Sequence, residues 1–149
     1  MTNDDSGSRA FTLIELLVAM GLAAILMAIA IPAFMTWLPT INLSSGARQL
    51  GIELQLARTK AVSQNTTYRI VFPALPAATY TVERFSGGAY VTESGPLNLP
   101  PGITVTVVSA AFNFTTRGTA TSTSTITLRN INGVTTTVTV NPVGRVRIP

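Results

Sequence analysis

One stretch decides the fold. Residues 11–38 read FTLIELLVAMGLAAILMAIAIPAFMTWL, and no side chain between Leu16 and Leu38 is charged. As a helix this uncharged part is roughly 35 Å long at ~1.5 Å per residue, enough to cross the ~30 Å hydrocarbon core of a bilayer. The sequence therefore predicts a transmembrane helical half over residues 11–38. Glu15 lies near its start, and because a carboxylate inside a membrane helix costs ~2.5–3.5 kcal/mol, such a residue usually has a function and a partner.

The composition excludes the common catalytic centres. The 149-residue chain contains neither His nor Cys. It therefore has no Ser-His-Asp or Cys-His catalysis, no disulfide and no His- or Cys-ligated metal. The acidic residues include no close pair outside Asp4 and Asp5. We expect a protein that is not an enzyme and that uses no cofactor or metal.

Positive charge is concentrated after the apolar stretch. From Pro39 onward nine basic residues face three acidic ones, a balance of +6, whereas the whole chain has a net charge of +4. The basic residues are Arg48, Arg58, Lys60, Arg69, Arg84, Arg117, Arg129, Arg145 and Arg147, and the acidic ones are Glu53, Glu83 and Glu93. A basic surface attracts polyanions such as nucleic acid or anionic lipid. Solubility of a Thr-rich surface with few charges is the simpler explanation.

Residues 1–10 are short and polar, as in a leader. An ordinary secretory signal peptide is the alternative, with Ala28-Ile29-Ala30 as its cleavage site. The two aspartates of the leader, Glu15 within the apolar region, and the apolar run beyond Ala30 all disfavour that alternative.

A second helical segment follows the apolar one. Pro32 removes a backbone hydrogen bond and should kink or loosen the helix. Asn42, Ser44 and Ser45 offer capping oxygens for a helix that resumes. Apolar residues then recur every three or four positions, as on the face of a helix that packs on a sheet; they are Leu43, Ala47, Leu50, Leu54, Ala57 and Ala61. We expect residues 39–64 to form the amphipathic half of the helix.

From residue 65 onward the apolar period changes to two, which indicates strands. The clearest signal is a hairpin whose turn, Asn130-Ile131-Asn132-Gly133, separates two stretches of alternating β-branched residues. Phe112-Asn113-Phe114 is expected to form a short strand, and residues 144–148 the last one. The predicted fold class is α+β, with a long N-terminal helix packed on an antiparallel β-sheet head formed by residues 65–149.

The stretch Ala10-Phe11-Thr12-Leu13-Ile14-Glu15-Leu16, followed by an unbroken apolar run, resembles the prepilin cleavage site of type IV pilins and type II secretion pseudopilins. The resemblance implies cleavage between Ala10 and Phe11 by a prepilin peptidase, methylation of Phe11, and assembly with major and minor pilin subunits through the N-terminal helix. It also implies single-pass insertion in the bacterial inner membrane, with a cytoplasmic N-terminus and a periplasmic head, followed by a place in a pilus at the cell surface. Gly is usual where this chain has Ala10, and Ala is also small.

Such a cleavage would give Glu15 a partner. The new α-amino group at Phe11, with a pKa near ~8, is cationic and can lie beside Glu15 of a neighbouring subunit. Paired charges satisfy each other in lipid, where isolated ones are costly. We therefore expect Glu15 to set the register of assembly and Pro32 to be the point where the helix loosens. A Glu that is merely tolerated at the interface is the alternative.

Two further stretches resemble the GspH/FimT group of minor pilins and pseudopilins. They are the helix end at residues 50–61 and the β head with Phe112-Asn113-Phe114, Arg117-Gly118 and a late hairpin. Within that group, Gly144-Arg145-Val146-Arg147 resembles the Gly-Arg-x-Arg element with which FimT-type minor pilins bind DNA in natural transformation. The resemblance implies double-stranded DNA as a partner, bound by Gly144, Arg145 and Arg147, with help from Arg117 and Arg129.

Elementary geometry is consistent with that role. In a strand, Arg145 and Arg147 lie on one face ~6.6 Å apart, while Val146 and Ile148 point inward. Two guanidinium groups can grip phosphates without reading sequence, and Gly144 permits a tight approach or bend. Charges on a terminal edge strand can also serve only to block pairing with another chain.

The leading prediction is thus a minor type IV pilin that binds extracellular double-stranded DNA non-specifically for uptake. The alternatives are a GspH-like minor pseudopilin of a type II secretion system, which is structural and binds no DNA, and a pilus-priming subunit whose basic head docks on other minor pilins.

Overall fold

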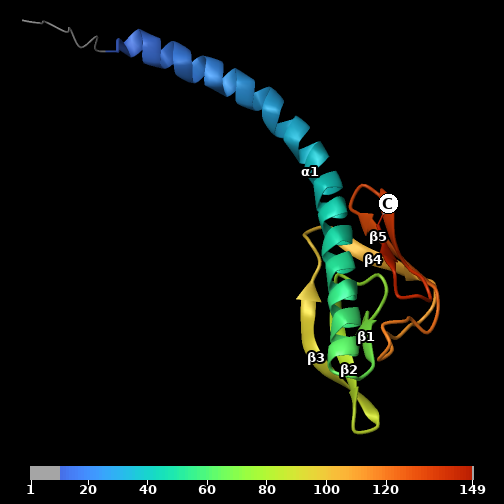
Figure 1. Ribbon diagram of the computed structural model, residues 1–149. Helices are drawn as coiled ribbons and strands as arrows, with labels where there is room; N and C mark the ends of the chain where they lie inside the picture. Colours follow the sequence, from blue (N-terminus) through green and yellow to red (C-terminus); the bar gives the residue numbers. More distant parts are fainter. Residues whose placement is uncertain (1–10, 149) are drawn as a thin grey trace, which may run out of the picture. The chain divides into compact units, whose positions relative to one another are not determined.

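The computed structural model describes residues 11–148. The predicted leader, with Ala10, lies outside the described residues. One helix, α1 (Leu13–Ser63), precedes seven strands (Figure 1). The strands are β1 (Tyr68–Val71), β2 (Thr79–Ser86), β3 (Ala89–Asn98), β4 (Ile103–Val108), β5 (Ser124–Asn130), β6 (Thr135–Val140) and β7 (Val146–Arg147). The predicted α+β class is confirmed. The chain divides into two compact units between Trp37 and Leu38, and we call the second unit the head.

Helix α1 runs without interruption through Pro32 and Pro39. The restart that we expected Asn42, Ser44 and Ser45 to cap is therefore wrong. Two of these side chains bond elsewhere: Ser44 Oγ donates to Ile41 O at 3.0 Å, and Asn42 Nδ2 donates to Pro101 O at 3.1 Å. A proline removes one helical hydrogen bond, but starting a new helix requires a fresh and unfavourable nucleus, so propagation through the proline is the cheaper outcome. Among the described residues, α1 is also the helix that is long and apolar enough to cross a membrane.

The strands form two antiparallel sheets. Sheet A has the order β1-β2-β3 and sheet B the order β4-β5-β6-β7. Isolated bridges link Tyr68 of β1 to Phe114, and Ala77, just before β2, to Val105 of β4. The strand expected at 112–114 is wrong, because Phe114 forms only bridges. The chain reverses directly after it, in a turn where Gly118 N donates to Thr115 O at 2.9 Å.

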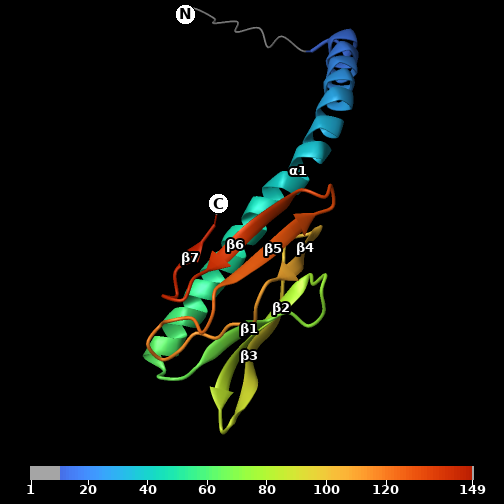
Figure 2. The same cartoon turned by 90° about the vertical axis from the view of Figure 1, so that its right-hand side faces the viewer.

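The core lies between the amphipathic half of α1 and the two sheets (Figure 2). Each of the six apolar residues predicted for the packing face of the helix is buried. They contact one hydrophobic cluster that includes Tyr68 and Tyr80 of sheet A and Ile126, Leu128 and Val138 of sheet B. Full burial of an aliphatic side chain contributes about 1.5–3 kcal/mol, so this face fixes the sheets on the helix.

The predicted hairpin at residues 130–133 is confirmed. Its strands pair from Ser124↔Val140 to Arg129↔Thr135. Asn130 Oδ1 accepts hydrogen bonds from Asn132 N at 3.0 Å and Val134 N at 2.9 Å, which closes the turn. This pairing places one end of sheet B at residue 129 and the other at residue 140.

Candidate nucleic-acid interface and assembly residues

Acidic residues of the head are confined to α1 and sheet A, whereas the half around sheet B has only basic ones. All three acids of the head, Glu53, Glu83 and Glu93, belong to α1 or to sheet A. Residues 99–149 contain no Asp, Glu or Lys but four arginines, at positions 117, 129, 145 and 147. The half of the head built around sheet B therefore has a charge of +4 that no acid of its own offsets.

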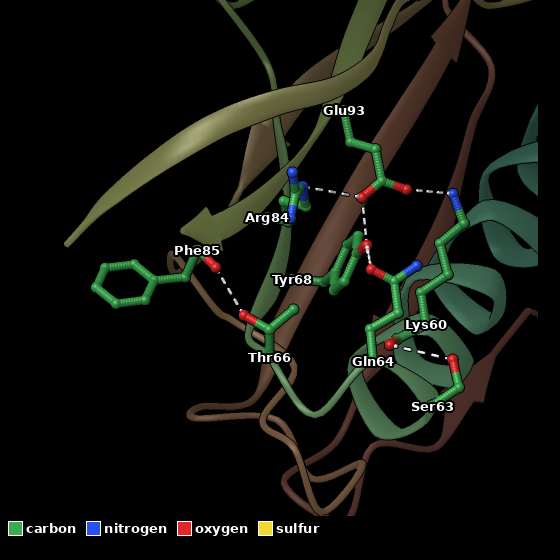
Figure 3. Close-up of polar contacts among 8 residues, drawn as sticks. All are labelled: Lys60, Ser63, Gln64, Thr66, Tyr68, Arg84, Phe85 and Glu93. Carbon is green, nitrogen blue, oxygen red and sulfur yellow. Dashed lines mark hydrogen bonds and ion pairs between the residues drawn. The ribbon is translucent and has the colours of Figure 1, made fainter. Parts of the chain in front are cut away.

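On the side of sheet A, a carboxylate network neutralises the cations (Figure 3). Glu93 Oε1 accepts from Lys60 Nζ at 2.6 Å, and Glu93 Oε2 lies 3.7 Å from Arg84 Nε and accepts from the Tyr68 hydroxyl. Burial, together with the bond to Glu93, raises the pKa of Tyr68 to about 12. Burial alone would raise the pKa of Glu93, but the bonds from Lys60 and Tyr68 hold it below 4.5. The network ties the end of α1 to all three strands of sheet A.

Arg69 is also paired. Its Nε and Nη2 both lie 2.7 Å from Glu83 Oε2, and its guanidinium carbon lies 3.7 Å from the centre of the Tyr90 ring. Such a stacked, bidentate arrangement occupies the donors that a phosphate would use. The cations next to sheet A are therefore poor candidates for a polyanion site.

The arginines near the last turn of the chain are placed by a contact between two glycines. Gly118 and Gly144 both have positive φ, at +75° and +76°. A Cβ placed on Gly144 would lie 2.0 Å from Gly118 O, so no other residue fits there. Arg58 of α1 holds both turns, because its Nε donates to Gly118 O at 2.7 Å and its Nη2 to Val143 O at 3.5 Å. The sequence predicted a tight approach or bend at Gly144, and in the structure Gly144 packs closely against the turn at Gly118.

This contact sets the turn that carries Arg117 against the turn that carries Arg145, since each arginine directly neighbours one of the two glycines. Both side chains are exposed, as is Arg147, and Val146 between them is half-buried. Within residues 11–148, none of the three arginines forms an ion pair. We call Arg117, Arg145 and Arg147 the arginine cluster.

The last strand is shorter than predicted. Strand β7 contains only Val146 and Arg147, because Gly144 turns the chain and Arg145 lies outside the strand. Arg145 N nevertheless donates to Asn141 Oδ1 at 2.8 Å, and Asn141 N donates to Arg145 O at 3.0 Å. Ile148 is 39% exposed, yet it packs on α1, since a Cβ at Gly51 would lie 2.6 Å from Ile148 Cδ1.

Two threonines that our sequence reasoning missed lie beside this strand. Thr137 and Thr139 of β6 line a shallow hollow together with Arg147 and Ile148. Threonine hydroxyls are common donors to phosphate. The pairing Thr139↔Arg147 explains the proximity, and no local sequence signal could have revealed it.

Arg129 lies apart from the arginine cluster. It pairs with Thr135 at one end of sheet B, whereas Arg145 follows the opposite end, ~17 Å away along the strand at ~3.3 Å per residue. Its Nη2 would lie 3.3 Å from a Cβ on Gly133, so the guanidinium covers the hairpin turn. The structure therefore does not bring Arg129 together with the other three predicted arginines.

At the other end of the chain, Phe11 is 82% exposed and precedes α1. Glu15 lies in the first helical turn, where its Oε2 accepts from Thr12 N at 3.0 Å and Thr12 Oγ1 at 2.9 Å; Thr12 Oγ1 in turn lies 3.3 Å from Glu15 N. This is a capping box, and its signature, Thr-x-x-Glu, stands in the sequence. Sequence reasoning missed this partner inside the same subunit, and the pairing of Glu15 with a neighbouring subunit stays a prediction.

Comparisons with known proteins agree with this architecture. The prokaryotic N-terminal methylation motif matches residues 5–31, and the family described as type II transport protein GspH matches residues 46–144. Among solved structures, the type IV minor pilin FimU of Pseudomonas aeruginosa is similar, with 20% identity and a TM-score of 0.60 over 72% of this chain and 87% of FimU. The minor pseudopilin EpsH of the Vibrio cholerae type 2 secretion system has 11% identity and a TM-score of 0.61 over 72% of this chain and 96% of EpsH.

At these identities the two structures show a shared fold. A search of curated protein sequences finds no match. The family match, in contrast, extends over well over half of the chain and includes the amphipathic end of α1, both sheets and the Gly144 turn. With the methylation motif and the apolar helix in front of that region, the chain belongs to the GspH family, the minor pilins and pseudopilins of type IV pili and type II secretion systems.

Proposed function

We propose that this protein is a minor subunit of a type IV pilus whose head binds double-stranded DNA without sequence preference, for uptake in natural transformation. One observation supports the proposal above all. The arginine cluster is exposed on the acid-free half of the head and forms no ion pair within the described residues, whereas Lys60, Arg69 and Arg84 are all paired.

The arrangement suits phosphate binding. Arg147 belongs to β7 and Arg145 to the turn just before it, and both side chains are exposed, with the half-buried Val146 between them. Arg117 adds a third guanidinium from the neighbouring turn. Guanidinium groups on a rigid backbone grip phosphate oxygens bidentately and position a duplex without reading its bases.

The same proposal includes how the subunit reaches the filament. A prepilin peptidase would remove residues 1–10 by cutting between Ala10 and Phe11, and Phe11 would be methylated. Residues 11–38 would anchor the chain in the inner membrane, and the head, with the amphipathic helical half at residues 39–64 and the β-sheets that follow, would lie in the periplasm. Assembly would pair Glu15 with the Phe11 amine of a neighbouring subunit, with Pro32 as a weak point of the helix. No catalysis and no cofactor is involved.

A second candidate is a minor pseudopilin of a type II secretion system. The family description and the EpsH fold favour it. In that role the arginine cluster would only protect the edge of β7 from pairing with other chains. The head would then touch protein partners and show no affinity for DNA beyond that of its net charge.

Full-length protein in nanodiscs of zwitterionic lipid separates the two functions. Duplex binding is measured by fluorescence anisotropy across a range of salt concentrations. If Arg145 and Arg147 each neutralise one phosphate, the double variant Arg145→Ala/Arg147→Ala should flatten the log–log salt slope by about 1.8.

Arg129→Ala is the matched control, because it removes one exposed arginine from the far end of the same sheet. It should leave the slope close to that of the wild type. An unchanged slope in the double variant, or no binding at low salt, overturns the DNA proposal and leaves the pseudopilin role.

A further inference from the structure

The tip of the β5–β6 hairpin lies at the end of the head where α1 enters (Figure 2). Near this end, Asn42 of the helix bonds to Pro101 in the loop between β3 and β4. Ile131 in the hairpin turn contacts the same loop, since its Cγ2 would lie 3.0 Å from a Cβ on Gly102. The β2–β3 turn at residues 87–88 lies at the opposite end (Figure 1). Two loops thus form one surface beside the entering helix.

This surface has an apolar tip and a cation behind it. Ile131 is 73% exposed and Val134 49% exposed. Arg129, which forms no ion pair with any described residue, lies against the turn at Gly133. No acidic residue is present from position 99 onward. Exposed aliphatic side chains with an adjacent cation are typical of segments that rest in the interface of an anionic bilayer.

The position on the chain gives the surface access to lipid. Leu38 ends the uncharged stretch and begins the head. Asn42, which contacts the loop under the tip, is four residues further on, or ~6 Å along a helix. Only a few residues of the chain thus separate the loop under the tip from the end of the uncharged stretch.

We infer that the hairpin tip, through Ile131 and Arg129, is a lipid-contact site that rests on the anionic headgroup layer of the inner membrane before the subunit enters a filament. The inference does not depend on DNA binding. It gives Arg129 a role at its own end of sheet B, where the arginine cluster does not reach.

The test uses full-length protein in vesicles, and the absence of Cys from the chain allows a single label. A fluorophore on Asn132→Cys reports on the tip, and one on Ala89→Cys reports on the opposite hairpin. Quenching by spin-labelled lipid headgroups should be strong at position 132 and absent at position 89. In vesicles with anionic lipid, Arg129→Gln should lower the equilibrium constant for tip contact about fivefold, and Ile131→Ser should lower it as well.

Thermal melting of each variant shows that the head remains folded, and Val91→Ser serves as a control for removing an exposed aliphatic residue elsewhere. Equal quenching at positions 132 and 89 overturns the inference. So does quenching that is unaffected by both substitutions. If quenching at position 132 changes with protein concentration and not with lipid charge, the tip contacts a second copy of the chain and not lipid.

Discussion

The sharpest prediction concerns Gly144, where the structure allows the cost of a single methyl group to be worked out. In Gly144→Ala the new Cβ would lie 2.0 Å from Gly118 O and 2.8 Å from Arg58 Nε, in a backbone with φ of +76°. The left-handed conformation alone costs an L-residue roughly 1–2 kcal/mol. Relief of the clash must separate the two turns and break the bond from Arg58 to Gly118 O, a charged hydrogen bond of about 1.5–3 kcal/mol.

The expected destabilisation is therefore about 2.5–5 kcal/mol. Gly87→Ala is the matched control, because Gly87 also has positive φ, +61°, but a Cβ there would meet nothing within 4 Å. It should cost only the conformational part, about 1 kcal/mol.

Thermal unfolding of the head, followed by the near-ultraviolet circular dichroism of the buried Tyr68 and Tyr80, measures the difference. At about 4 °C per kcal/mol for a domain of this size, Gly144→Ala should melt about 10–20 °C below the wild type and Gly87→Ala only about 4 °C below it. Equal shifts for the two variants would refute the reasoning, since they would mean that the contact between the two glycine turns contributes nothing.

Two further predictions concern the carboxylates. The bonds from Lys60 and Tyr68 hold the pKa of Glu93 below its unfolded value, so the stability that they add is present above about pH 4.5 and is lost as the pH falls through the folded pKa. Glu93→Gln should be less stable than the wild type near neutral pH and should lose less stability on acidification. Melting temperatures measured at several pH values check this, and an equal dependence of the melting temperature on pH in the two proteins would contradict it. Glu15→Leu should insert in the membrane at least as well as the wild type yet fail to enter filaments, as measured in sheared filament fractions. Thr12→Val breaks the capping box but keeps the carboxylate, so it should still be incorporated. Normal incorporation of Glu15→Leu would exclude the pairing of Glu15 with a neighbouring subunit.

Features that depend on local periodicity could be predicted from the sequence. The packing face of α1, from Leu43 to Ala61, was predicted correctly because burial of one helical face imposes a spacing of three and four residues. The hairpin at residues 130–133 was also correct, because an Asn-Gly turn between β-branched strands is a strong local signal. The restart expected at residues 42–45 was wrong, because a helix that loses one hydrogen bond at a proline need not end and begin again.

The candidate site could be predicted only in part, since it is made by contacts that are distant in sequence. Gly144 and its two arginines were identified as candidates from their resemblance to the Gly-Arg-x-Arg element. The proximity of Arg117 depends on Gly118 meeting Gly144, and on Arg58 bonding to both turns. Likewise, Arg129 and Arg145 seem alike in the sequence, and only the register of β5 against β6 separates them.

The contact of β7 with α1 has a mechanical consequence. The last described residues of the chain lie against the part of α1 within the head, with Ile148 on Gly51 and the Gly144 turn on Arg58. A pull along α1 is therefore transmitted to sheet B across many side chains at once, in shear, and does not peel the strands away one after another. In a filament subunit under tension, these contacts resist unfolding of the head, because α1 must slide past β7 before sheet B can unfold.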